Sequence, residues 1–165
     1  MLDGICAFFE ARSFNDVNAL SPAEREKVLP FIVEWATWRA REFSGAELMA
    51  AWTQVVAMRE ATVRATQPFD FVLSPTSPVA SWPAEAHSPN DDPHDALAHI
   101  AFTVPYNISE QPAASLNWTA GTDGLPLSVQ VAGRRFDDMG VLRISRALEL
   151  LRGEQKPWPQ PAGAA

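Results

Sequence analysis

The side chains best suited to acid–base or metal chemistry are concentrated in one acidic segment. Three histidines and three aspartates lie close together there: His87, Asp91, Asp92, His94, Asp95 and His99. Their spacing matches none of the common zinc patterns, and an Asp-Asp-Pro run is typical of a solvated loop. We therefore expect no metal and no cofactor. A hydrolase that uses this loop stays open as a weaker alternative, which replacement of His94 by alanine would test.

The hydroxyl and thiol groups lack the partners of an activated nucleophile. Serine hydrolases hold the nucleophile beside a base and an oxyanion site, and no Gly-x-Ser-x-Gly elbow is present. Ser74 and Ser77 are flanked by prolines, which fix the backbone without activating a hydroxyl. Cys6 lies in an apolar segment with no histidine nearby in the sequence, so a buried structural thiol is expected. The sequence therefore predicts no catalytic residue in this chain.

Helices dominate the expected structure of the first 67 residues. Ser21-Pro22-Ala23-Glu24 and Ser44-Gly45-Ala46-Glu47 each place a glutamate three residues after a capping serine. The second of these boxes predicts the longest helix, over about residues 45–66. Pro30 predicts a kink or a new helix start. The apolar residues of the long helix that should face a core are Leu48, Trp52, Val55, Val56 and Val63.

A strand, a long loop, a strand pair and a helix are expected from residue 68 to residue 159. The nearly continuous apolar run at 69–73 predicts a strand buried on both faces, and five prolines in residues 75–93 predict a long irregular loop. Residues 114–119 and 127–131 alternate with period two around a glycine turn, which predicts an antiparallel pair. A short helix is expected at 95–102.

A last helix should begin at Asp137 and Asp138 and end before Pro157-Trp158-Pro159, with residues 160–165 frayed. Its predicted apolar side consists of Val141, Ile144, Leu148 and Leu151. With no internal repeat, residues 1–165 are interpreted as a single region. The fold class is α/β, with a partial mixed β-sheet and flanking helices.

Charge and composition exclude several classes of function. A formal net charge of −7 and an isoelectric point near 4.9 argue against a nucleic-acid partner. No stretch approaches the ~20 apolar residues that span a bilayer, and no secretory signal is recognisable, so no membrane association is expected. A single cysteine fits a reducing compartment. We expect a cytoplasmic protein.

Four stretches after residue 68 form an ordered set of motifs. They are FDFVLSPT at 69–76, TVPYN at 103–107 with QPAAS at 111–115, GLPLSVQVAGR at 124–134, and the closing helix at 136–151 with its Pro-Trp-Pro tail. In this order they resemble the C-terminal portion of the amidase signature family. Glu110 stands where that family usually has glycine, and Ser128 where it often has a second glycine.

The resemblance implies a hydrolase that breaks amide C–N bonds with two serines and a lysine. Here no Gly-Gly-Ser-Ser segment occurs, and the two lysines, Lys27 and Lys156, lie in a charged run and in the tail. The expected role is therefore that of a C-terminal amidase fragment, inactive alone, which completes the sheet and the substrate cavity of a full-length enzyme. A small-molecule amide would bind only together with an absent N-terminal amidase part, as a partner or a preceding segment.

Three polar residues are implied to lie near that cavity: Thr103, Asn107 and Gln130. Contact with substrate and bracing of the backbone both remain open for them. The alternative function is a stand-alone, non-catalytic binding or assembly module derived from the amidase fold.

Overall fold

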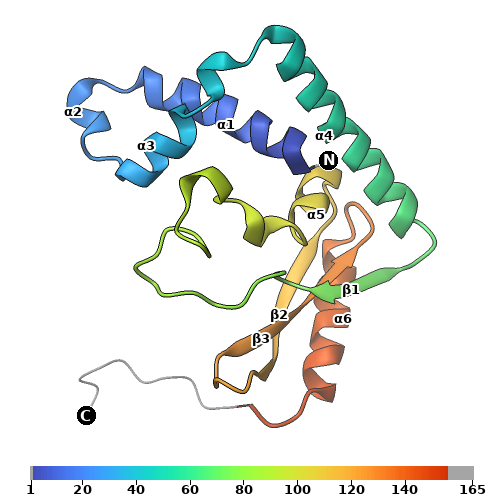
Figure 1. The fold of residues 1–165 in the computed structure, drawn as a ribbon. Helices are drawn as coiled ribbons and strands as arrows, with labels where there is room; N and C mark the ends of the chain where they lie inside the picture. The colour runs from blue at the N-terminus through green and yellow to red at the C-terminus, as the bar shows by residue number, and fades with distance from the viewer. Residues whose placement is uncertain (1, 156–165) are drawn as a thin grey trace, which may run out of the picture.

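A computed structural model describes residues 2–155 of the chain (Figure 1). The Pro-Trp-Pro tail, Lys156 and residues 160–165 lie outside the described residues. The helices are α1 (Leu2–Ala19), α2 (Pro22–Arg25), α3 (Pro30–Thr37), α4 (Gly45–Thr66), α5 (Val104–Ser109) and α6 (Asp138–Leu151). The strands are β1 (Phe71–Pro75), β2 (Ala113–Ala120) and β3 (Pro126–Gly133). In the described part of the chain, no helix combines the length and apolar character needed to cross a membrane.

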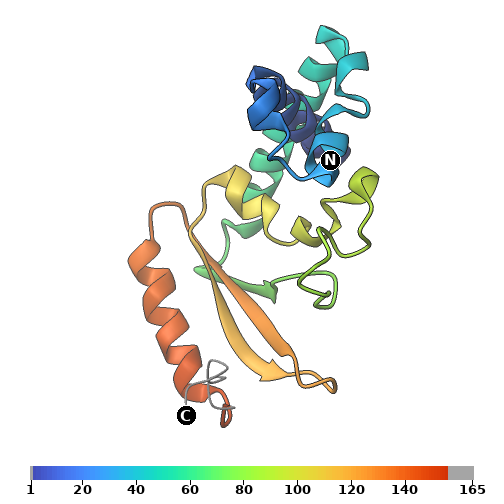
Figure 2. The same cartoon turned by 90° about the vertical axis from the view of Figure 1, so that its left-hand side faces the viewer.

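The three strands form one antiparallel sheet in the order β1-β3-β2. The predicted β2–β3 pair is confirmed, with a turn over residues 121–125 and an irregularity between Asn117 and Thr119. Helix α6 packs on one side of this hairpin, while the segment between β1 and α5 lies on the other side (Figure 2). Gly133 permits the close approach of α6, because a Cβ atom there would lie 2.6 Å from Val141 Cγ2. The α/β fold class with flanking helices is thus confirmed.

The local signals for helix starts are confirmed. Ser44 caps α4, accepting a hydrogen bond from the Glu47 amide while the Glu47 carboxylate accepts from the Ser44 amide and hydroxyl. These bonds lower the pKa of Glu47. Since the charged form is the bonded form, this support for α4 is lost as the pH falls through that lowered pKa. Pro30 begins α3, as a proline in the first turn can.

The long loop is present, but the expected helix at 95–102 is reduced to two short turns. These are single 3-10 turns at Pro93–Asp95 and Ala98–Ile100, and residues 76–92 contain no regular element. Pro93 starts the first turn, and the side chain of Asp92 caps it by accepting from the His94 amide at 2.8 Å. The prolines and the local side-chain cap hold this segment in a compact but non-helical path.

The main apolar cluster joins three helices. Ile5 of α1, Val55 and Met58 of α4, and Val104 of α5 are buried together. Beside this cluster, the almost fully buried Glu10 accepts two hydrogen bonds from Arg39, at 2.5 and 2.9 Å. Arg39 also lies over the ring of Trp38, 4.8 Å from its centroid. Apolar contacts therefore join α1 to α4 and α5, and the Glu10–Arg39 ion pair joins α1 to the segment just after α3.

The predicted burial of α4 is wrong for three of its five apolar residues. Val55 is buried, whereas Leu48, Trp52 and Val56 are exposed by 37, 45 and 48%. Helix α4 lies at the outer edge of the molecule (Figure 1), and its contacts with α1 and α5 cover only one side of it. The remaining apolar side faces solvent in this structure.

Strand β1 and the end of α6 are also less buried than the sequence predicts. Strand β1 pairs only with β3, so it is an edge strand, and Leu73 is 55% exposed. In α6, Val141 is buried against the sheet, whereas Leu151 in the last turn is 76% exposed. The Thr76 amide continues the β1–β3 ladder by donating to the Ser128 carbonyl at 3.4 Å. Pro75 fits an edge strand, since it has no amide hydrogen to donate.

Candidate functional site

The register divides the sheet into an apolar face and a polar face. Residues directly opposite each other in a sheet point to the same side. Val131 therefore shares a face with Leu73 and Ala114, its cross-strand partners, and this is the face that α6 covers. Polar residues occupy the opposite face: Ser74, Thr76, Ser115, Asn117, Ser128 and Gln130. We call these six residues the polar face.

Gln130 occupies the centre of the polar face and is only 4% exposed. Its side-chain amide nitrogen donates to Ser74 Oγ at 3.0 Å and to the Phe102 carbonyl at 2.9 Å. Gln130 therefore links β3 to β1 and to the segment that precedes α5. Burial raises the pKa of Tyr106 on α5, and a hydrogen bond with Ser74 partly offsets that rise. One connected set of hydrogen bonds thus positions α5 over the sheet.

The two other residues singled out from the sequence lie just before α5 and on it. Thr103 precedes α5, and its hydroxyl donates to the Ile100 carbonyl at 3.1 Å. Asn107 lies on α5 and is exposed, and its side chain makes no hydrogen bond with another described residue. Thr103 and Gln130 therefore brace the backbone in this structure, whereas the Asn107 amide is available to a ligand.

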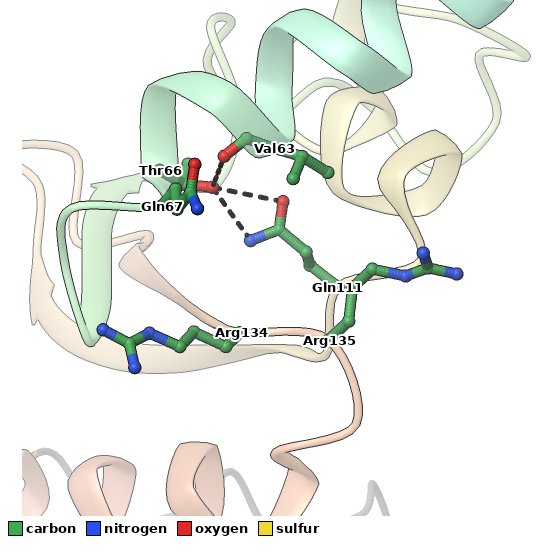
Figure 3. Close-up of a pocket in the computed structure, with 6 residues that line it drawn as sticks. All are labelled: Val63, Thr66, Gln67, Gln111, Arg134 and Arg135. Atoms are coloured by element: carbon green, nitrogen blue, oxygen red, sulfur yellow. Dashed lines mark hydrogen bonds between the residues drawn. The ribbon is translucent and has the colours of Figure 1, made fainter.

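A hollow of about 480 Å³ lies where α4 ends beside the turn after β3 (Figure 3). Gln111 crosses it, donating to Thr66 Oγ1 at 3.1 Å and to the Gly133 carbonyl at 2.8 Å. Arg134 at its rim pairs with Asp70 at 3.2 Å, and Arg135 pairs with Glu110. Gln111 and the two arginines of this hollow are thus already paired, and Gln111 joins the end of α4 to the sheet.

The histidines anchor the loop and do not gather around a common point. His87 stacks on Phe31 and His94 on Trp38, with ring centroids 5.0 and 4.4 Å apart, and His99 contacts Trp82. No group of three or more metal-ligating side chains occurs among residues 2–155. His87 therefore fastens the loop to α3, and His94 fastens it to Trp38, the residue that caps the C-terminus of α3.

Among the residue types Asp, Glu, Lys and Arg, residues 65–133 contain only the acidic ones. No lysine or arginine occurs in residues 65–133. Seven carboxylates lie in the same stretch: Asp70, Glu85, Asp91, Asp92, Asp95, Glu110 and Asp123. The polar face consists of neutral donors and acceptors in an acidic region, and its hydroxyls have no lysine or histidine among their described hydrogen-bond partners. Such a surface offers neutral hydrogen-bond donors and acceptors to a ligand.

Replacing Gln130 by leucine is expected to destabilise the folded chain by about 2 kcal/mol. The change leaves the Phe102 carbonyl and the Ser74 hydroxyl without their partner inside the structure. Urea unfolding followed by circular dichroism measures the loss, with the exposed Asn117→Ala on the same face as the matched control. Equal, small effects of the two changes would mean that Gln130 does not brace the sheet.

Comparison with known proteins identifies the family. The family model described as "Amidase" matches residues 3–142. The chain belongs to the Amidase family. The match extends over the helical region, α1 to α4, over the three motifs between residues 69 and 134, and over the start of α6.

Amidase-family relatives match over different shares of their own length. The chain is 32% identical over 142 residues to a Glutamyl-tRNA(Gln) amidotransferase subunit of Myxococcus xanthus, covering 85% of this chain and 29% of that protein. It is 39% identical over 164 residues to an uncharacterised protein in the nthA 5′ region of Rhodococcus erythropolis, covering 98% of this chain and 77% of that protein. The chain thus spans less than a third of the Myxococcus protein.

A solved structure supports the same fold. A bacterial aryl acylamidase of the amidase signature enzymes matches with a TM-score of 0.69 at 22% identity, over 91% of this chain and 33% of that chain. The described helices and sheet are therefore arranged as in an Amidase-family fold.

Glu110 stands where the family usually has glycine, and two neighbouring arginines help to explain how a glutamate fits there. Glu110 ends α5 with a φ of 59°, in the left-handed region that glycine adopts without strain. In this Amidase-family chain, Arg59 lies 2.8 Å from the Glu110 carboxylate, and Arg135 pairs with it too. These two ion pairs offset part of the backbone strain of a residue with a Cβ atom.

The sequence motifs did not reveal most of the polar face. Ser74, Thr76, Ser115, Asn117 and Ser128 were not among the binding residues expected from the sequence. Their signal was the period-two alternation of the β2 and β3 segments, which becomes a shared face only after the strand register is known.

Proposed function

We propose that this Amidase-family chain forms the substrate-orienting wall of an amide hydrolase whose two serines and lysine lie in a separate amidase region. The observation that carries the proposal is the polar face, which offers neutral hydrogen-bonding groups with no base beside them. The family match over less than a third of the longer Myxococcus protein supports a further region. So does β1, whose free edge can accept another strand.

The proposed wall acts by hydrogen bonding and orientation. A carboxamide needs a donor for its carbonyl oxygen and an acceptor for its N–H, and Asn and Ser side chains supply both. Asn107 would contact the substrate directly, since its side chain has no partner in the described structure, while Thr103 and Gln130 would hold α5 and β3 in place. Nucleophilic attack and proton transfer would come from the separate region, because acyl transfer requires an activated hydroxyl and an oxyanion site.

The chain alone is expected to release no ammonia from propionamide or benzamide above the buffer rate. Addition of the serine- and lysine-bearing region of a full-length relative, prepared separately, should restore turnover. Asn107→Ala should then lower kcat/KM by about tenfold, the loss of roughly one hydrogen bond in the transition state. Ammonia release is measured by a coupled assay.

Two controls separate the possible results. Lys27→Ala should leave the restored rate unchanged, since Lys27 lies between α2 and α3, away from the polar face. Ammonia release by the repurified chain alone, unaffected by further chromatography, would overturn the proposal.

A second candidate is a stand-alone binding or assembly module. The Rhodococcus relative favours it, because this chain matches 77% of that protein, which has little additional length for a catalytic region. This candidate predicts a monomer that unfolds in one cooperative transition without any added region. Aggregation that the serine- and lysine-bearing region relieves would instead favour the proposed hydrolase wall.

A further inference from the structure

A separate cavity of about 310 Å³ lies between α1, α3 and the turns at residues 94–100. These elements lie together on the helical side of the molecule (Figure 1). Its lining combines polar groups with the apolar side chains of Ile5, Trp35, Leu97 and Ile100. Its volume is at the lower end of the range found for small-molecule sites. No residue of the polar face lines it, so the inference below does not depend on the proposed function.

The charged groups around this cavity are mostly acidic. Asp3, Glu10 and Asp95 line it together with one arginine, Arg39. Arg39 is bonded to Glu10, so that pair contributes no net charge. Asp3 makes no hydrogen bond or ion pair with another described residue, and Asp95 accepts only from the neutral amide of Asn90, at 2.7 Å. Among the described residues, these two carboxylates therefore have no cationic partner.

The two carboxylates lie on the solvent-exposed side of the cavity. Both aspartates are exposed, whereas Ile5 at the inner wall is fully buried. The negative charge thus lies at the mouth and the apolar surface lies inside. Cys6 in the wall responds to the same charges: burial raises the pKa of its thiol, and Glu10, Asp3 and Asp95 raise it further while Arg39 lowers it.

We infer that this cavity binds a small organic amine, with its apolar chain against Ile5, Trp35 and Leu97 and its ammonium group at the mouth beside Asp3 and Asp95. An apolar chain gains by leaving water for this wall. The ammonium group stays partly hydrated between two carboxylates, which avoids the cost of a buried charge. A carboxylic acid with the same chain would meet like charges at the mouth and bind more weakly.

The test follows the Trp35 indole N–H resonance of the ¹⁵N-labelled chain, assigned by its disappearance in Trp35→Phe. Hexylamine, 1-hexanol and hexanoate are added in separate titrations at pH 7. Hexylamine should shift this resonance saturably in the millimolar range or below. The alcohol should bind roughly three- to tenfold more weakly, a difference expected for exposed ion pairs. Hexanoate should bind most weakly.

Charge-matched variants decide whether the two carboxylates are responsible. Asp3→Asn combined with Asp95→Asn should remove the preference for hexylamine over hexanol. Asp16→Asn combined with Glu85→Gln changes the net charge equally at exposed positions outside the cavity lining, and should keep the preference. No saturable shift with hexylamine, or equal affinities for amine and alcohol in the unmodified chain, would overturn the inference.

Discussion

Replacing Arg39 by leucine should destabilise the folded chain by about 3 kcal/mol, the largest effect expected for a single polar change here. Glu10 is 3% exposed, and Arg39 is its only cationic partner among the described residues. The change leaves a carboxylate in the interior without a counter-ion or its two donors. Water can reach the site from the side of Arg39, whose side chain is 36% exposed, which holds the loss near the low end of the range for buried pairs.

The measurement is urea unfolding of four forms: the unmodified chain, Arg39→Leu, Glu10→Leu, and the double variant. The double variant should recover much of the loss, because it removes both charges and leaves an apolar pair. Arg64→Leu is the matched control, since its pair with Glu60 is exposed and should contribute less than about 0.5 kcal/mol. An Arg39→Leu effect no larger than that of the control would contradict the ionic fastening of α1.

Truncating Ile5 to alanine should cost about 3 kcal/mol, and Ile5→Val about 1 kcal/mol. Ile5 is fully buried and packs in the cluster with Val55, Met58 and Val104, so a smaller residue leaves a space that three helices must close. The graded pair of changes distinguishes loss of packing from a general disturbance of α1.

Thermal or urea unfolding measures both changes, with Leu150→Ala as the control. Leu150 is 70% exposed on α6, and its truncation should change stability by less than about 0.5 kcal/mol. If Ile5→Ala proved as mild as Leu150→Ala, helix α1 would not form part of the cooperative core.

Those parts of the fold that depend on neighbouring residues were predictable from the sequence. The Ser44-to-Glu47 box and Pro30 determine helix starts through bonds and sterics within one turn, so α3 and α4 begin where expected. The glycine-containing turn and the alternating residues around it likewise specify the β2–β3 hairpin. Each of these signals acts over a few residues, where sequence and geometry are closely coupled.

Burial was less predictable because it depends on distant parts of the chain. An apolar run such as residues 69–73 indicates a strand, but it does not reveal how many neighbours that strand has. The same limit applied to the polar face, where Ser74, Gln130 and Ser115 meet only through the register of three strands. Gln130 was singled out by family resemblance, yet its bracing contact to the Phe102 carbonyl comes from a segment outside the sheet.

The edge position of β1 has a consequence for amide exchange with heavy water. In an antiparallel ladder, alternate amides face the partner strand. Since the Thr76 amide points to β3, those of Val72 and Ser74 do too, while those of Phe71 and Leu73 point outward. In the isolated chain, the inward pair should exchange slowly and the outward pair quickly. A strand that docks on this edge would slow Phe71 and Leu73, and because Pro75 has no amide hydrogen, the protected stretch would end before it.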